Sequence, residues 1–242
     1  MYLDENFNIV QRDGDQGDTA QRSGFLESAL IIREMLDISN DEFLKETPWR
    51  FDHIVNTLFI DKKLIRNPIK WSDPNDTSRD QTNPMLIACG LKGDLEKVQW
   101  LRPKGWLLLK YQNADVASPA DIAVVDRALG LKPSWLGDLW AYFGIRIRCA
   151  QAKKDQDDTG DDLNTLIAAV FCYMVTPTKQ STRNLKYYLD NRPQSFGTTK
   201  LGEKDFVIGS LCWYFRPETG GNPELANLWA PIIKSLREEL KC

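Results

Sequence analysis

The chain has 242 residues, of which 42% are hydrophobic and 27% charged, and its formal net charge is −3 with a pI near 5.4. This composition suits a globular protein with a substantial core and argues against disorder over most of the chain. The acidic balance argues against a nucleic-acid partner, because a protein that follows a phosphate backbone needs a basic surface. The first residues lack the basic and apolar regions of a signal peptide, and no apolar run is long enough to span a membrane. We therefore expect a cytoplasmic protein with no membrane contact.

Apolar residues recur at helical spacing through most of the chain, so the predicted elements are nearly all helices. In the first half, helices are expected over residues 20–36, from Phe43, from Thr47 to Phe59, over 79–91 and over 95–101, with a long loop over 62–77. In the second half, helices are expected from Ser118 to Leu129, from Ser134 to Ile147, over 163–174, over 178–189 and from Asn222 to Leu236, with an apolar segment over 206–214.

Cap residues support these boundaries. Asp94 and Ser134 offer side-chain oxygens to the first turns of two helices. Gly90 or Gly93 lies near the end of the helix over 79–91, and Gly130 follows Leu129 at the end of another. The result is a single all-α domain over residues 1–242, with about nine or ten helices in antiparallel hairpins. A compact or incomplete (α/α) toroid is one arrangement of such hairpins.

Two residue types carry further expectations. Trp135, Trp140, Trp213 and Trp229 fall at helical core spacings, so we expect them to pack in the interior. The five cysteines are odd in number and widely spaced, which fits neither a disulfide framework nor a C-x-x-C metal site. We interpret them as buried thiols, except for Cys242, which should be a free thiol at the end of the chain.

The spelling D-x-x-D-T occurs three times, at residues 15–19, 73–77 and 155–159, each time shortly before a predicted helix. Helix capping alone explains such a pattern, since Asp and Thr oxygens accept hydrogen bonds from the unpaired N–H groups of a first turn. The third copy is followed by neither arginine nor glutamine, so we interpret it as a cap and a charged turn.

The first two copies contain more than capping requires, because each combines several acids with an arginine and a glutamine within about ten residues. In a toroid of helical hairpins alternate loops gather at one end, so these loops could line one pocket. Glycoside chemistry uses one carboxylic acid to protonate the leaving oxygen and a second carboxylate to activate water or to attack. The candidate catalytic residues are Asp18, Asp76 and Asp80, and the candidate substrate-binding residues are Gln21, Arg22, Trp71, Arg79 and Gln81.

Other chemistries fit less well. Asp13, Asp15 and Asp18 alternate as calcium ligands do, but the spacing departs from that of an EF-hand, so calcium is a weak option and no other cofactor is expected. His53 is the only histidine, which excludes a metal site with several histidines.

The segments G-D-T-x-x-R-x-G at residues 17–24 and D-x-S-R-D-Q at residues 76–81 resemble those of uncharacterised phage and bacterial proteins. This resemblance implies no particular activity, but it adds a phage virion as a location and protein partners in a larger assembly. More loosely, helices opened by acidic, arginine and glutamine residues are similar to those of (α/α) toroid glycosidases and polysaccharide lyases.

Two hypotheses remain. In the first, a saccharide-directed pocket requires Asp18 and Asp80 to reach a common cleft with carboxyl groups about 5–10 Å apart. In the second, the protein is a non-enzymatic virion, assembly or interaction component, and the same charges form a structural ion-pair network. The second hypothesis requires Arg22 and Arg79 to be buried and bonded by Asp partners.

Overall fold

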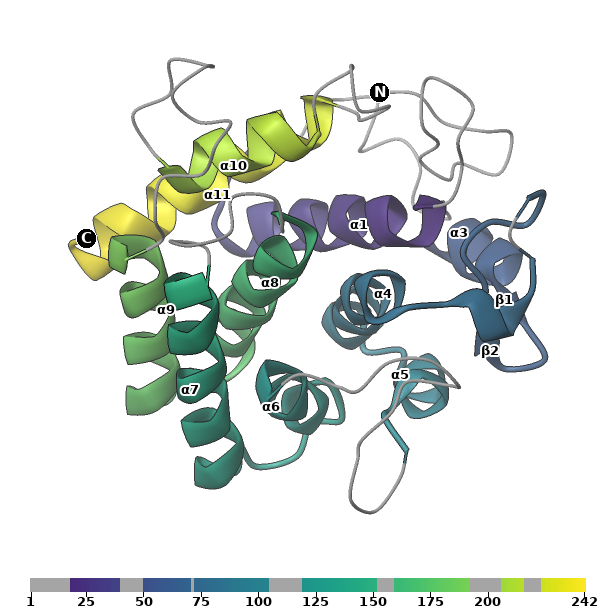
Figure 1. Ribbon diagram of the computed structural model, residues 1–242, viewed down its shortest axis with the longest axis horizontal. Coiled ribbons are helices and arrows are strands. Elements are labelled where there is room, and N and C mark those ends of the chain that lie inside the picture. The colour runs from purple at the N-terminus through teal and green to yellow at the C-terminus, as the bar shows by residue number, and fades with distance from the viewer. Residues whose placement is uncertain are drawn as a thin grey trace.

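The structure, a computed structural model, describes residues 18–39, 50–70, 72–104, 119–151, 159–191, 206–215 and 223–242. Within these ranges the protein is all-α, with ten α-helices, one short 3-10 helix and one pair of two-residue strands (Figure 1), which confirms the predicted class. The elements are α1 (Thr19–Met35), α3 (Arg50–Leu58), β1 (Phe59–Ile60), β2 (Lys63–Leu64), η1 (Pro74–Asp76), α4 (Arg79–Lys92), α5 (Leu95–Leu101), α6 (Pro119–Ala128), α7 (Trp135–Gln151), α8 (Thr159–Val175), α9 (Lys179–Asn191), α10 (Phe206–Tyr214) and α11 (Pro223–Leu240).

Helix α1 lies at the centre of the fold, with α4 on one side and α11 on the other (Figure 1). Every residue from Thr19 to Leu30 is buried. The helix approaches α4 closely at Gly24, where an added Cβ would lie 2.6 Å from the carbonyl carbon of Pro84. The missing side chain of this glycine therefore sets the distance between α1 and α4.

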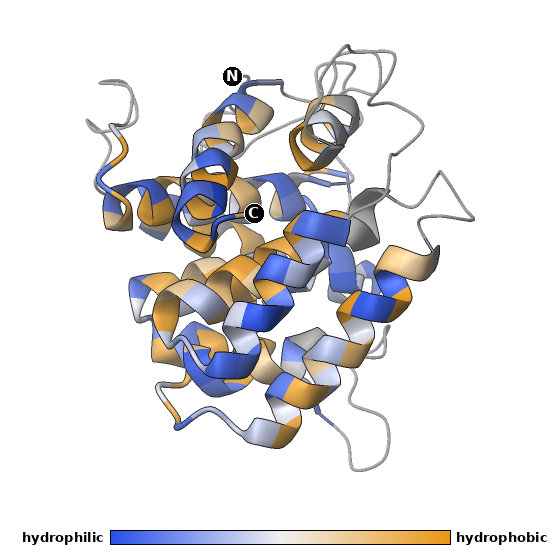
Figure 2. Cartoon of the chain, turned by 90° about the vertical axis from the view of Figure 1, so that its left-hand side faces the viewer, coloured by the Kyte–Doolittle hydropathy of each residue, from blue (hydrophilic) through white to orange (hydrophobic). Residues whose placement is uncertain are grey.

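Helices that follow one another in the chain pack as pairs around this centre, namely α4 with α5, α6 with α7, α8 with α9, and α10 with α11. The buried hydrophobic residues form one cluster that extends from Ala20 in α1 to Leu236 in α11. Hydrophobic residues concentrate where helices face one another, and hydrophilic residues lie mostly outward (Figure 2). The predicted inward face of the last helix is confirmed, since all six of its apolar positions are buried: Leu225, Leu228, Trp229, Ile232, Ile233 and Leu236.

The predicted caps are found where the structure describes them. Asp94 accepts a hydrogen bond from the backbone of Lys97 at 3.1 Å, and Gly93 and Gly130 adopt the left-handed conformation that favours glycine. The Thr47 cap and the short helix expected from Phe43 lie outside the described residues.

The segment predicted as a loop over residues 62–77 contains regular structure. Phe59 pairs with Leu64 and Ile60 with Lys63 in a small antiparallel hairpin. Asp61 and Lys62 both have positive φ angles, which is the geometry of a tight two-residue turn. Two residues a strand give too little alternation for the pattern to be detected.

The prediction for the tryptophans is right for Trp229, which is fully buried, and wrong for Trp135 and Trp140. Trp135 is 71% exposed and Trp140 is 55% exposed, although both belong to α7. The side chain of Trp213 lies outside those described. Helical spacing identifies a face, but it does not say whether another element of the chain covers that face.

The thiols largely follow the prediction, with Cys89, Cys149 and Cys172 buried, Cys212 half-buried and Cys242 exposed. Burial raises the pKa of Cys172 to about 12 and raises that of Cys89 as well, so both stay protonated and unreactive at neutral pH. We expect Cys242 to react first with a disulfide reagent at pH 8, and Cys242→Ser to remove this fast phase. Rapid labelling of Cys89, Cys149 or Cys172 in the Cys242→Ser protein would contradict their described burial, and all thiols should react in denaturant.

Among the helices that the structure describes, none combines the length and the hydropathy that crossing a bilayer requires. The (α/α) toroid and the single domain over the whole chain stay predictions.

Candidate functional site

The structure brings together the first two acidic segments, although Asp18 and Gln81 lie 63 positions apart in the chain. Asp18 immediately precedes α1, and Gln81 lies in the first turn of α4, which packs along α1. The Nε2 group of Gln81 donates a hydrogen bond to Oδ1 of Asp18 at 3.0 Å. The first two acidic segments, each of which also contains an arginine and a glutamine, therefore meet at one end of the α1–α4 pair.

Helix capping does not account for the carboxylate of Asp18, which makes no side-chain cap hydrogen bond to α1. Instead the backbone oxygen of Arg66 accepts a hydrogen bond from the N–H of Ala20 at 3.0 Å. A segment outside α1 therefore supplies an acceptor for an N–H group in the first turn of the helix. The Arg66 side chain pairs with Asp18 at 3.2 Å, and the side chains of both residues are between a quarter and a third exposed. Asp18 is thus held from two sides and still reaches the surface.

The amide of Gln81 is oriented by its own helix start. The backbone N–H of Ser78 donates to Oε1 of Gln81 at 3.1 Å, as in a capping box. With the amide oxygen engaged in this way, the NH₂ group points to Asp18. The cap of α4 therefore fixes the donor that holds the Asp18 carboxylate.

Behind Asp18 lies a buried group of polar and aromatic side chains. The hydroxyl of Tyr214 in α10 donates to Oε1 of Gln21, and the guanidinium of Arg22 lies 5.7 Å from the ring centroids of Tyr214 and Phe215. Burial raises the pKa of Tyr214 well above its usual value, and the negative charge of Asp18 raises it further. Tyr214 therefore serves as a neutral hydrogen-bond donor and not as a base.

The second candidate carboxylate, Asp80, contacts a different helix. Asn164 in α8 donates to Oδ1 of Asp80 at 2.8 Å, and the backbone oxygen of Asn164 accepts from Asn83 at 3.4 Å. The side-chain oxygens of Asn83 and Asn164 are buried and have no hydrogen-bond partner within the part of the chain described. Buried acceptors of this kind usually face a water molecule or a ligand.

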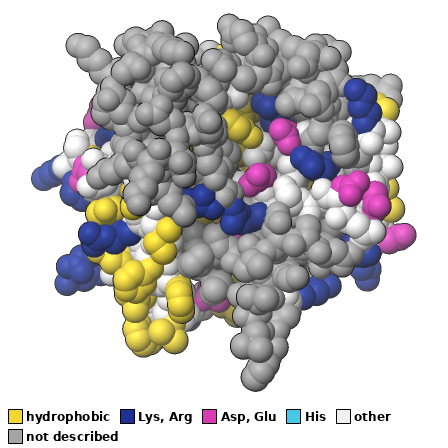
Figure 3. Space-filling view, viewed as in Figure 1, with side chains coloured by type: hydrophobic (Ala, Val, Ile, Leu, Met, Phe, Trp, Pro, Cys, Tyr) yellow, Lys and Arg dark blue, Asp and Glu magenta, His cyan; other side chains and the backbone are white. Residues whose placement is uncertain are grey.

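The side chains around Asp18 and Asp80 form a group that we call the polar cluster. Its members come from α1, α4, α8, α10 and the segment after β2. The charges of Asp18, Arg22 and Asp80 all act on the Tyr214 hydroxyl. Acidic and basic side chains adjoin one another over α1 and α4 in Figure 3. The members are Asp18, Gln21, Arg22, Arg66, Asp80, Gln81, Asn164 and Tyr214.

The remaining predicted site residues are less closely associated with the polar cluster. Asp76 is exposed in η1, and no contact with the polar cluster is found for it among the described residues. Arg79 is half-buried at the start of α4. Trp71 and the calcium candidates Asp13 and Asp15 lie outside the described residues, and within the described ranges no group of three acidic, histidine or cysteine side chains could hold a metal ion.

Three members of the polar cluster were not found from the sequence, namely Arg66, Asn164 and Tyr214. Each is a single polar residue in a segment that carries no motif, and Tyr214 lies 193 positions from Gln21. A tyrosine at the end of an apolar helix is an ordinary core residue by pattern. The sequence therefore offered no signal for these three.

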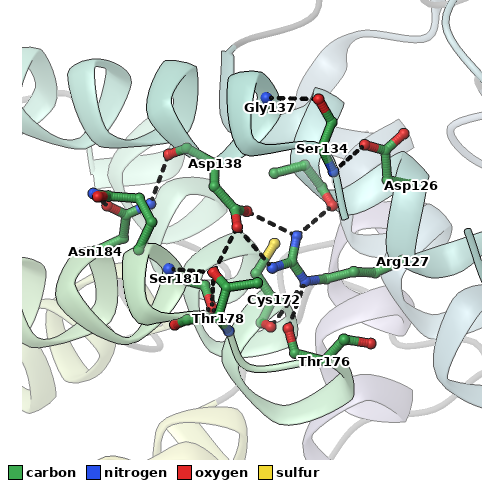
Figure 4. Close-up of polar contacts among 12 residues, drawn as sticks. Asp126, Arg127, Ser134, Gly137, Asp138, Cys172, Thr176, Thr178, Ser181 and Asn184 are labelled. Atoms are coloured by element: carbon green, nitrogen blue, oxygen red, sulfur yellow. Dashed lines mark hydrogen bonds and ion pairs between the residues drawn. The ribbon is translucent and has the colours of Figure 1, made fainter. Parts of the chain in front are cut away.

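A second buried polar group links α6, α7, α8 and α9 (Figure 4). Arg127 and Asp138 form a two-pronged ion pair at 2.9 and 3.3 Å, and the side chains of both are almost fully buried. Nε of Arg127 also donates to the backbone oxygens of Cys172 and Thr176 at the end of α8. Thr178 donates to the same carboxylate at 2.6 Å.

This second group is suited to holding helices together and not to binding a ligand. The adjoining void of about 10 Å³ has room for no more than a water molecule. Asn184 in α9 adds a bond to the backbone oxygen of Asp138 at 3.0 Å, so that α7 is fixed to α9 as well as to α6. We interpret the Arg127–Asp138 group as a structural lock.

An open groove of about 520 Å³ lies elsewhere, between α7 and α9. Its size is within the range of small-molecule sites. Among its described lining residues the one carboxylate is Asp190, which pairs with Lys186 at 3.5 Å. The polar cluster contains both Asp18 and Asp80, so we place the candidate chemistry there.

No protein-family model, no curated protein sequence and no solved structure matches this chain.

Proposed function

We propose that the protein binds and hydrolyses a saccharide at the polar cluster, with Asp18 and Asp80 as the paired carboxylates. The observation that carries this proposal is the meeting of two acidic segments, distant in the chain, at one end of the α1–α4 pair. Both carboxylates are only partly buried, and each is held by a side-chain amide from another helix. Glycoside hydrolysis requires such a pair, one as proton donor and one as base or nucleophile.

The cost of burying polar groups supports a functional role. Each polar side chain removed from water has to recover its hydrogen bonds, and a well-packed apolar residue would avoid this cost. The ends of α1 and α4 nevertheless bury a series of uncharged polar side chains: Thr19, Gln21, Ser23, Gln81, Thr82 and Asn83. Amides and hydroxyls of this kind suit the recognition of sugar hydroxyls and the positioning of carboxylates.

The polar cluster residues then have different roles. Gln81 and Arg66 position the Asp18 carboxylate, and Asn164 positions that of Asp80. Gln21 and Arg22 are buried behind them, so they act as supports for the site and not as direct contacts to a substrate. Asp76 has no part in this proposal.

The burial of Arg22 favours a second candidate function. Its guanidinium lies against two aromatic rings and is almost inaccessible, as a structural network would require. On this alternative the protein is a non-enzymatic component of an assembly, such as a phage virion, and the polar cluster locks its loops. The two candidates differ in what neutralising a carboxylate should do.

Substituting Asp18→Asn and Asp80→Asn separates the two functions. If the site is catalytic, hydrolysis of a panel of soluble oligosaccharides should fall by about 10²–10⁴-fold in each variant. The melting temperature should stay unchanged or rise, because active sites sacrifice stability for function. Release of reducing ends and thermal melts measure the two effects.

Asp76→Asn is the matched control, since it removes a carboxylate from the same segment outside the polar cluster. It should change neither hydrolysis nor the melting temperature. A wild-type protein that cleaves nothing in the panel, together with lowered melting temperatures for Asp18→Asn and Asp80→Asn, would refute the enzymatic proposal in favour of the structural network.

A further inference from the structure

Helix α7 is apolar on two opposite faces. One face packs in the core through Ala141, Ile145 and Cys149, which are buried. Four large apolar residues on the other side are about half exposed, with exposed fractions of 49–56%: Leu136, Trp140, Phe143 and Ile147. We call these four residues the α7 seam.

The spacing of the α7 seam is that of a helix that pairs with another helix. Steps of four, three and four residues separate its members, as at the a and d positions of a coiled coil. At 100° per residue the four side chains fall within about 60° of one another, opposite the buried face. In Figure 3 hydrophobic side chains gather at the left over α7.

The α7 seam is large for a surface that stays in water. Together with Trp135, which is 71% exposed at the start of the helix, it presents on the order of 600 Å² of apolar area. The largest such patch on an ordinary monomer is about 300–600 Å², and a standard interface buries about 800 Å² on each partner. The exposed area is therefore close to what one half of a dimer interface needs.

We propose that the α7 seam binds the same seam of a second copy of this chain, with the two α7 helices antiparallel. A two-fold axis between positions 141 and 142 places Leu136 opposite Ile147 and Trp140 opposite Phe143, in both directions. An isologous interface requires this reciprocity, in which residue i meets j and j meets i. If the partner were another protein, the apolar positions of the α7 seam would not need to be symmetric about the point between positions 141 and 142.

The charges beside the α7 seam are compatible with this arrangement. Arg146 is exposed, and its guanidinium lies 5.1 Å from the ring centroid of Tyr142 and 4.9 Å from that of Tyr187. In the antiparallel pair Arg146 comes opposite Gly137, so the two copies of Arg146 are about 14 Å apart along the helix axis. This exceeds the screening length of about 8 Å at physiological salt, whereas a parallel pair would place them side by side.

Sedimentation velocity of the full chain tests the proposal at concentrations from about 1 to about 200 μM, a range in which a dimer with a dissociation constant of about a micromolar or more dissociates measurably. The expected result is a species of twice the 27.7 kDa chain mass that dissociates on dilution. Trp140→Glu should give monomers throughout, since each copy would place a carboxylate in the centre of the interface. A wild-type chain that stays monomeric, or a Trp140→Glu chain that dimerises like wild type, would overturn the proposal.

Leu95→Glu provides a matched control for Leu136→Glu. Both leucines lie in the first turn of a helix, and their exposed fractions are 51% and 49%. Leu136→Glu should weaken the dimer at least tenfold and Leu95→Glu should not, while circular dichroism should show both to be folded. Equal weakening by the two substitutions would mean that the α7 seam is not the interface.

The register can be tested by charge pairing. In the antiparallel pair, Leu136→Glu/Ile147→Lys on one chain should restore the dimer, because each new carboxylate faces a new ammonium of the other copy. A mixture of a Leu136→Glu chain with a Leu136→Lys chain should stay monomeric. Restoration by the mixture and not by the double variant would show a parallel pair and overturn the antiparallel arrangement.

Discussion

Replacing Arg127 with methionine should destabilise the protein by about 3–5 kcal/mol, because the substitution leaves the buried carboxylate of Asp138 without its cation. The loss extends to the end of α8, where the backbone oxygens of Cys172 and Thr176 lose their shared donor. Urea unfolding followed by circular dichroism measures the free energy of unfolding.

Two variants define the origin of this effect. Arg183→Met removes an exposed arginine for which no ion pair with a described residue is found, and it should change the free energy of unfolding by less than about 0.5 kcal/mol. Arg127→Met/Asp138→Leu should recover part of the loss, since a buried pair replaced by apolar residues is often neutral. Recovery should be incomplete because the α8 carbonyls stay without their donor. A small effect of Arg127→Met alone would contradict the description of this pair as a lock.

Gly24→Ala should destabilise the protein by about 3 kcal/mol or more, which is large for one added methyl group. The new Cβ would lie 2.6 Å from the carbonyl carbon and 2.7 Å from Cβ of Pro84, and 2.7 Å from the backbone nitrogen of Met85. Backbone atoms cannot move aside as a side-chain tip can, so α1 and α4 would have to separate. Because these helices also bring Asp18 to Gln81, the variant should weaken any ligand binding at the polar cluster. Thermal melts and binding assays measure the two effects.

Gly137→Ala is the control for Gly24→Ala, since it adds the same methyl group to another helical glycine. At Gly137 the nearest atoms to an added Cβ lie 3.7 Å away, which is ordinary contact. The better helix propensity of alanine should then stabilise the protein by up to about 1 kcal/mol. Equal destabilisation by the two substitutions would contradict the close crossing of α1 and α4.

Features that depend on neighbouring residues in the chain were predicted well from the sequence. The start of α5 at Asp94 and the left-handed ends at Gly93 and Gly130 follow from local hydrogen bonding and from the freedom of glycine. The inward face of α11 follows from the 3.6-residue period. The hairpin of β1 and β2 was missed because two residues a strand carry no period.

The candidate site was predicted only in part. The excess of acids, arginine and glutamine around Asp18 and Gln81 distinguished the first two loops from the third, and the structure brings Asp18 and Gln81 into contact. The pattern did not show that the backbone oxygen of Arg66, and not the side chain of Asp18, accepts a hydrogen bond from the first turn of α1. No pattern in the chain pointed to Asn164 or Tyr214, because their positions in the polar cluster come from the packing of α8 and α10.

The sequence by itself determined that the chain is helical, where most of its helices begin and end, and which two loops are unusually rich in charge. These features depend on contacts within a few residues, which the order of amino acids specifies directly. Only the tertiary structure decided that Asp18 meets Gln81, that Arg127 and Asp138 are buried together, and that one apolar face of α7 stays exposed. These features depend on which helices pack against one another, and a helical period is the same whether a face meets the core, a second chain or water.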